Sequence, residues 1–205
     1  MRRFLLLLCV LGYAPVVASA QAQPEVEARL GPDRVLGPNP EWRVANLFEE
    51  GRWKDALESA YSIRLEWQVK SWRKRTIADA KGPSLQYSVI IRKQALLEEY
   101  QLITQFPGRR PREESYPTLA ELKVAVNSYV TSPFLLRDAG EWYYSVRLDI
   151  STHNDEELAK LQQFMDDPAA GDRSGGGAVT RGVMRLFLPT QTLSGNTETF
   201  SVRAR

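Results

Sequence analysis

The sequence predicts a mainly β fold of the α+β class, an antiparallel sheet or sandwich with short helices packed at an edge or face. Two segments, residues 61–72 and 142–150, alternate apolar and polar side chains with a period of two, as a strand with one buried and one wet face does. At least four segments alternate in this way, and none has the near-continuous apolar run of a strand in a parallel sheet. Helical spacing occurs only in short segments, so we expect the helices to accompany the sheet.

The N-terminal part of the domain is rich in glycine, proline and charge. Residues 24–30 alternate as a first strand, and residues 42–48 predict a second, short one. Between them, residues 31–33 and 37–40 are Gly/Pro segments typical of turns. A helix is then predicted over residues 52–60, with an apolar stripe of Trp53, Ala56, Leu57 and Ala60.

The longest alternating segment begins at residue 61, and its apolar face consists of Tyr61, Ile63, Leu65, Trp67 and Val69. We therefore place Trp67 in the core and Arg64, on the polar face, in water. Residues 85–103 predict two strands. The alternation of apolar and polar residues shifts by one position near Lys93 and Gln94, and such a shift requires a turn or bulge. The first phase is held by Leu85, Tyr87, Val89 and Ile91, and the second by Leu96, Tyr100 and Leu102. A Pro/Gly/Arg loop follows at residues 106–111.

Thr118 begins the best-defined helix, because Thr118 and Glu121 form a capping box directly after Pro117. The apolar stripe of this helix consists of Leu119, Leu122, Val126 and Tyr129. In residues 142–150 the inward-facing side chains are Trp142, Tyr144, Val146, Leu148 and Ile150. Residues 154–168 and 179–188 predict two more short helices around a flexible loop at 171–177. Residues 199–203 predict the last strand, with Phe200 and Val202 facing inward.

The first twenty residues have the composition of a secretory signal peptide. Arg2 and Arg3 precede an apolar run at 4–17, and residues 18–20 offer the small-x-small pattern that a signal peptidase cleaves. We expect export to the periplasm or the cell exterior, with residues 21–205 as a single β-rich domain and no transmembrane segment after cleavage. An uncleaved anchor is the weaker alternative because the run is short. A lipoprotein is also disfavoured, since Leu8 precedes Cys9 where a lipobox needs a small residue.

The composition narrows the chemistry that the mature chain can perform. Cys9 is the only cysteine, so cleavage removes every route to a disulfide, a thiolate nucleophile or a Cys-ligated zinc. Arg2 and Arg3 leave as well, so that 27 basic against 25 acidic residues become equal numbers, which argues against a nucleic-acid binder. His153 is the only histidine, and we interpret it as a loop or cap residue. The sequence predicts no cofactor and no metal site.

Adjacent carboxylates are the remaining reagents for hydrolytic chemistry; they occur at Glu49-Glu50, Glu98-Glu99, Glu113-Glu114, Asp155-Glu156-Glu157 and Asp166-Asp167. A glycosidase needs two carboxylates about 5–10 Å apart in a cleft. Most of these groups lie in expected helices or loops, where charge is simply solvated. Glu98 and Glu99 are the exception, since adjacent strand residues face opposite ways and one could point inward. We interpret the glycines at 175–177 as a flexible loop rather than an anion-binding nest.

Residues 70–75 are the most suggestive polar segment, because they place a tryptophan among four cations on a strand. The candidate recognition patch consists of Lys70, Trp72, Arg73, Lys74 and Arg75. Cation–π and charge contacts would let such a patch hold an anionic glycan, a lipid headgroup or an acidic protein. The plainer interpretation is a solvated strand end whose tryptophan covers a neighbouring residue.

The order of elements also resembles a known family. The features that carry the resemblance are the run at 55–60 before an alternating strand that ends in residues 72–75, Tyr100 in a Leu-rich strand, the helix start at 116–119, the strand at 142–148 and a terminal strand at Phe200. Over about residues 25 to 203 the chain is similar to the exported bacterial family known only as domain of unknown function four-three-nine-zero. The insertion at 171–177 departs from that compact pattern. The resemblance implies no activity, substrate or catalytic residue.

These observations predict a non-enzymatic exported envelope protein, a small β-rich binding or accessory module whose partner is an envelope protein or an anionic surface. Two alternatives stay open. A carboxylate-dependent hydrolase acting on cell-wall or glycan material would need a deep pocket with two buried acids. A carrier of an apolar ligand would need a large apolar cavity.

Protein purified from its native host is expected to begin at Gln21, free or as pyroglutamate, because residues 18–20 direct cleavage after Ala20. Mass spectrometry of the intact protein measures this directly. Mature, membrane-free protein that retains Met1 would contradict the signal-peptide interpretation.

Overall fold

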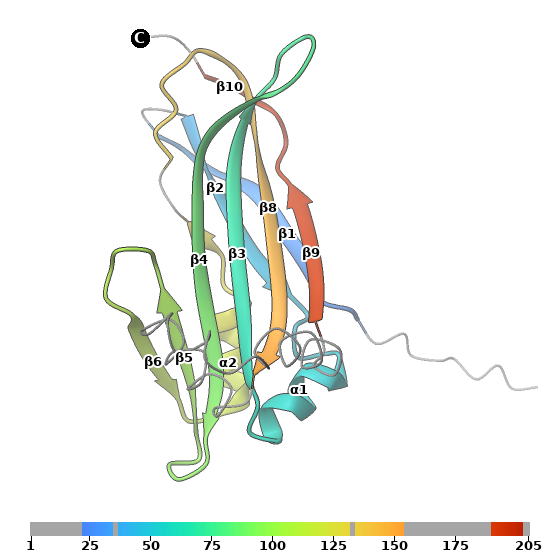
Figure 1. Ribbon diagram of the computed structural model, residues 1–205, viewed down its shortest axis with the longest axis vertical. Helices are drawn as coiled ribbons and strands as arrows, with labels where there is room; N and C mark the ends of the chain where they lie inside the picture. Colours follow the sequence, from blue (N-terminus) through green and yellow to red (C-terminus); the bar gives the residue numbers. More distant parts are fainter. Residues whose placement is uncertain (1–21, 35–36, 132–133, 154–189, 203–205) are drawn as a thin grey trace, which may run out of the picture.

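The computed structural model describes residues 22–34, 37–131, 134–153 and 190–202. The described residues form two antiparallel sheets and two short helices (Figure 1), which confirms a mainly β fold of the α+β class. The helices expected at 154–168 and 179–188 and the loop expected at 171–177 lie outside the described residues. Within the described ranges, no helix is long and apolar enough to span a bilayer.

The large sheet is built around β3, which pairs antiparallel with β4 on one side and along its whole length with β8 on the other. The strands of this sheet are β3 (Ser62–Arg73), β4 (Ala80–Gln94), β5 (Glu99–Gln105), β6 (Arg112–Tyr116), β8 (Gly140–His153), β9 (Thr190–Asn196) and β10 (Phe200–Val202). Their order is β10-β8-β3-β4-β5-β6, and β9 pairs with a different stretch of β8 from β10. The two short strands therefore follow one another along the same edge of β8.

The small sheet has the order β1-β2-β7 and lies across the β8–β9 side of the large sheet (Figure 1). Its strands are β1 (Glu25–Arg34), β2 (Gly37–Ala45) and β7 (Val130–Thr131). The two sheets approach closely at Gly195, where an added Cβ would lie 2.9 Å from the backbone oxygen of Val26. The absence of a side chain at Gly195 thus lets β1 pass directly over β9.

Both turns expected in the small sheet are wrong. Residues 31–33 belong to β1, where the register with β2 shifts between Leu30 and Asp33, and residues 37–40 are the first residues of β2. A β-bulge accommodates glycine and proline because it already interrupts the hydrogen-bond ladder. The prolines of β2 are tolerated for a related reason. β7 pairs only with Glu41 and Trp42, so in the described residues the edge of β2 that faces away from β1 is unpaired where the prolines lie.

The core lies between the two sheets and is rich in aromatic side chains. Trp42 of β2 donates its indole N–H to the hydroxyl of Tyr87 on β4 over 2.9 Å. Tyr87 also stacks on Trp67 and Phe106, with ring centroids 6.3 and 4.7 Å away. Burial raises the pKa of the Tyr87 hydroxyl, which therefore stays protonated. All five inward-facing residues expected on β8 are buried, as are Ile63, Leu65, Trp67 and Val69 on β3.

Three expected side-chain positions need correction. Tyr61 is not in the core: it is 37% exposed and precedes β3, where its N–H bonds to Ala56 at the end of a helix. Leu96 is 99% exposed because it lies in the turn between β4 and β5 rather than in a strand. Arg64 is only half-buried and pairs with Glu66 over 2.9 Å, instead of standing free in water.

The helices are α1 (Gly51–Glu58) and α2 (Leu119–Val126). The expected cap of α2 is confirmed, since the Thr118 hydroxyl accepts the Glu121 N–H over 3.2 Å. Two residues of each helix are buried, Trp53 and Leu57 in α1 and Leu122 and Val126 in α2. Two of the expected stripe residues lie outside the helices: Ala60 follows α1 with a φ of +62°, and Tyr129 follows α2.

Replacing Trp67 by alanine is expected to lower the free energy of unfolding by about 3–5 kcal/mol, because it deletes a large buried side chain and leaves a cavity against Tyr87. Gln86→Ala, at an exposed position next to Tyr87 on β4, should stay within about 0.5 kcal/mol. Urea-unfolding midpoints measure both changes. Equal losses in the two variants would contradict the assigned faces of the large sheet.

Candidate functional site

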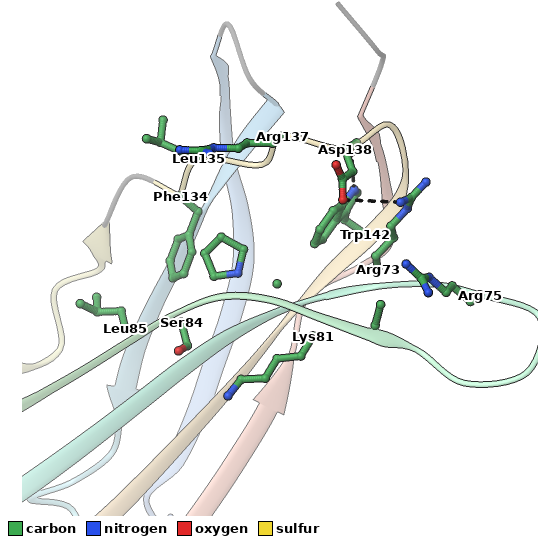
Figure 2. Close-up of a pocket in the computed structure, with 13 residues that line it drawn as sticks. Arg73, Arg75, Lys81, Ser84, Leu85, Phe134, Leu135, Arg137, Asp138 and Trp142 are labelled. Carbon is green, nitrogen blue, oxygen red and sulfur yellow. Dashed lines mark hydrogen bonds and ion pairs between the residues drawn. The ribbon is translucent and has the colours of Figure 1, made fainter.

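A groove of about 620 Å³ lies at the end of the sandwich where β3 ends and β4 begins (Figure 2). Its other wall is residues 134–138, the segment that leads toward β8. Four cationic residues border it, and we call this site the basic groove: the side chains of Arg73, Arg75 and Arg137 are its cations, whereas Lys81 pairs with Trp72 and its side chain points to the opposite face of the sheet (Figure 2). The apolar part of the lining includes Leu85, Phe134, Leu135 and Trp142, and the single carboxylate is Asp138.

A β-bulge shapes the floor of the basic groove. The register between β3 and β4 shifts between Lys70 and Trp72, so that Gly82 and Pro83 of β4 together oppose Ser71 of β3. Ser71 donates its hydroxyl to the backbone oxygen of Pro83 over 2.9 Å. A Cβ at Gly82 would lie 2.5 Å from the Ser71 hydroxyl oxygen and 2.6 Å from Cζ3 of Trp142. Only glycine therefore lets β4 pass this close to Trp142.

A second set of contacts positions Arg73. Its guanidinium pairs with the Asp138 carboxylate over 3.6 Å, and the backbone oxygen of Asp138 accepts the Trp142 indole N–H over 3.0 Å. Gly140, at the start of β8, has a φ of +139°, and a Cβ there would lie 2.8 Å from Nε of Arg73. Because Gly140 has no side chain, the Arg73 guanidinium packs against the backbone there. The contacts with Asp138 and with the start of β8 thus fix the position of Arg73 at this end of the groove (Figure 2).

The basic groove carries more positive charge than its carboxylate compensates. Among the described residues, no carboxylate lies within ion-pair distance of the side chains of Arg75, Lys81 or Arg137. The nearby Asp79 carboxylate is engaged elsewhere, since it accepts the Tyr143 hydroxyl over 2.9 Å and the backbone N–H of Arg75 over 3.2 Å. A groove with excess positive charge attracts anions.

The structure divides the recognition patch that the sequence singled out. Arg73 and Arg75 line the basic groove. Lys70 and Trp72 are half-buried and, by strand alternation, lie on the opposite face of the sheet. Lys74 is exposed beyond the end of β3, and its backbone N–H bonds to the oxygen of Glu141 over 2.8 Å. The five residues therefore do not form one contiguous surface.

Sequence reasoning missed Lys81 and Arg137. Lys81 was overlooked because the strand expected after residues 61–72 began at Leu85, whereas β4 begins at Ala80 and pairs Lys81 with Trp72. Arg137 comes from a distant segment that only the pairing of β8 with β3 brings to this end of the sheet. Extending the β3–β4 hairpin backward from Leu85 would have found Lys81, but no local signal in the sequence marks Arg137.

A second groove, of about 500 Å³, lies beside α1 and contains a compensated cluster of Glu58, Lys93 and Tyr100. Lys93 donates to the Glu58 carboxylate, and the Tyr100 hydroxyl donates to it over 2.7 Å. These hydrogen bonds, that of Lys93 above all, lower the pKa of Glu58, so its carboxyl is ionised at neutral pH. The cluster joins α1 to β4 and β5.

Glu98 and Glu99 do not converge on a buried site. Glu98 is exposed in the turn before β5 with a φ of +53°, and Glu99 is half-buried at the first position of that strand. The two residues therefore do not alternate within one strand, which was the basis for expecting one of them to point inward. Among the described residues, no three His, Cys, Asp or Glu side chains gather in a way that could hold a metal ion.

The small sheet carries a third polar cluster. Arg43 donates two hydrogen bonds to Glu27, over 2.8 and 3.0 Å, and the Tyr129 hydroxyl donates to the same carboxylate over 2.7 Å. The bond from Tyr129 and those from Arg43 lower the pKa of Glu27. The Arg29 guanidinium lies 3.7 Å from the centre of the Tyr129 ring and pairs with Glu41 over 2.8 Å. Every charge in this cluster has a partner, so the cluster ties the segment after α2 to the small sheet.

No protein-family model matches this chain, and neither the curated proteins nor the solved structures contain a significant match to it.

Gly82→Ala is expected to lower the free energy of unfolding by about 1–3 kcal/mol, because the added methyl group has to displace Ser71 or Trp142. Gly51→Ala is the matched control, since its Cβ would meet only a carboxylate oxygen of Asp55 at 3.7 Å. Denaturant unfolding together with near-ultraviolet circular dichroism of the tryptophans would detect the change. Unaltered stability and spectrum in Gly82→Ala would show that β4 does not pass Trp142 as closely as described.

Proposed function

We propose that this protein is an exported, non-enzymatic binding module of the cell envelope that holds an anionic partner in the basic groove. The observation that carries the proposal is the gathering of Arg73, Arg75 and Arg137 around a single carboxylate, Asp138. Export is supported by the composition of residues 1–20. Membership of the family known as domain of unknown function four-three-nine-zero stays a prediction from the order of elements.

The chemistry of the lining favours an anion with several charged groups. Guanidinium groups donate two parallel hydrogen bonds to a carboxylate or phosphate, and Arg75 and Arg137 have no described acidic neighbour within ion-pair distance to compete for them. Because Arg73 is held by Asp138 and packed at Gly140, part of the site is ordered before a partner arrives. Such order lowers the entropic cost of binding.

The two alternative functions receive less support from the described residues. For a hydrolase, the Glu58 carboxyl in the second groove is ionised and bonded to Lys93, and Asp138 in the basic groove pairs with Arg73. The Glu58 carboxyl is therefore not placed to donate a proton as a general acid. For a carrier of an apolar ligand, three arginine side chains around the larger groove favour a charged ligand instead.

The test measures binding to dextran sulfate, a soluble polyanion, by the protein and by the variant Arg75→Gln/Arg137→Gln. We expect the variant to bind at least about tenfold more weakly, because it loses two of the three groove arginines. Binding by the parent protein should also weaken between 0.1 M and 1 M salt, as the screening length falls from about 10 Å to about 3 Å.

The matched control is Lys54→Gln/Arg110→Gln, which removes the same charge from exposed positions outside the groove. This control should bind dextran sulfate nearly as well as the parent protein, and both variants should keep their thermal midpoints. Equal weakening in the two double variants would show that net charge, and not the basic groove, governs binding.

A further inference from the structure

The loop between β3 and β4 carries an isoleucine that the fold does not use. Residues 74–79 project beyond the end of the large sheet (Figure 1). Ile77, within this loop, is 99% exposed. Among the large apolar side chains that the structure describes, only Leu96, in the turn between β4 and β5, is equally exposed. A single exposed isoleucine is ordinary, but one that lies together with other exposed apolar and cationic side chains marks a surface for contact with a partner.

The surroundings of Ile77 are basic, and a second exposed apolar side chain lies at the same end of the molecule. Lys74 and Arg75 belong to the same loop and are exposed. Leu135, which is 61% exposed, lines the opposite wall of the basic groove next to Arg137 (Figure 2). This end of the sandwich therefore combines exposed apolar side chains with groove cations that outnumber the one carboxylate among the groove's described lining residues.

Hydrogen bonds fix the base of the loop. The Lys74 N–H donates to the oxygen of Glu141 over 2.8 Å, which ties the loop to the start of β8. Asp79 accepts both the Arg75 N–H and the Tyr143 hydroxyl, over 3.2 and 2.9 Å. The Asp79 carboxylate thus joins the two ends of the loop and holds them to β8. A clamped loop loses less conformational entropy on binding than a free one.

We propose that this end of the molecule docks on an anionic lipid bilayer, with Ile77 and Leu135 entering the interfacial region and the groove cations contacting headgroup phosphates. The inference rests on the proposed function and names its partner. A soluble acidic glycan or acidic protein surface would satisfy the cations but would leave Ile77 in water. A bilayer supplies both the negative charge and the apolar layer beneath it.

The experiment is flotation of the protein with vesicles of phosphatidylcholine containing about one-third phosphatidylglycerol, compared with vesicles of phosphatidylcholine alone. The parent protein should float with the anionic vesicles and remain unbound with the neutral ones. Ile77→Ser should weaken binding by about tenfold, the contribution of one buried isoleucine side chain. Leu96→Ser is the matched control, because Leu96 has the same exposure in a hairpin turn away from the groove, and it should bind like the parent.

The outcomes separate this inference from the proposed function. Binding to dextran sulfate without binding to anionic vesicles would overturn membrane docking and leave the basic groove as an anion site. Vesicle binding that Ile77→Ser does not weaken, or that Leu96→Ser weakens equally, would overturn insertion of the loop. Failure to bind either probe would overturn both proposals.

Discussion

The hydrogen bond between Trp42 and Tyr87 is the contact on which the sandwich depends most directly. Its donor belongs to the small sheet and its acceptor to the large one, and both side chains are buried. Burying an indole N–H or a hydroxyl without a hydrogen-bond partner lowers the stability of the fold. The two groups can satisfy each other only at the spacing that the two sheets adopt. Tyr87 also stacks on Trp67 and Phe106, and it thereby fixes β4 against both β2 and β3.

The position of β4 in turn decides where the basic groove can form. Below the bulge, β4 follows β3 residue by residue, from the pair Ile63 and Ile91 to the pair Lys70 and Ser84. The extra residue at Gly82 and Pro83 then breaks this register and alters the course of the strand, as bulges do. The same bulge places Lys81 opposite Trp72 and brings β4 within contact of Trp142. The groove is therefore a consequence of one extra residue in a strand that is otherwise paired regularly.

The predictable parts of the fold are the strands in which the alternation of neighbouring residues alone decides which face of the sheet each side chain occupies. The period of two in β3 and β8 identified their buried faces because both strands lie at the centre of a sheet with one side against the core. The same rule failed at Tyr61 and Leu96, which continue the apolar pattern into segments that are no longer extended. The prediction also failed at the prolines of β2. Glycine and proline occur in turns, in bulges and at free strand edges alike, so their presence does not distinguish a turn from a strand.

The candidate site was only partly predictable, for a different reason. A run of cations in the sequence suggested one patch, but strand alternation sends Lys70 and Trp72 to one face while Arg73 lines the groove on the other. Arg137 joins the site through the pairing of distant strands, which no local pattern reports.

What distinguishes the groove from the other polar clusters is charge without compensation. Around Glu27 and Glu58 each cation meets a carboxylate, and such pairs hold elements of the fold together. The groove cations instead gather beside a single carboxylate, an arrangement that favours an anionic partner. Screening by salt would weaken the attraction to that partner. Positive charge that meets no carboxylate among the described residues, at a hollow in the surface, is the physical ground for treating the groove as a binding site.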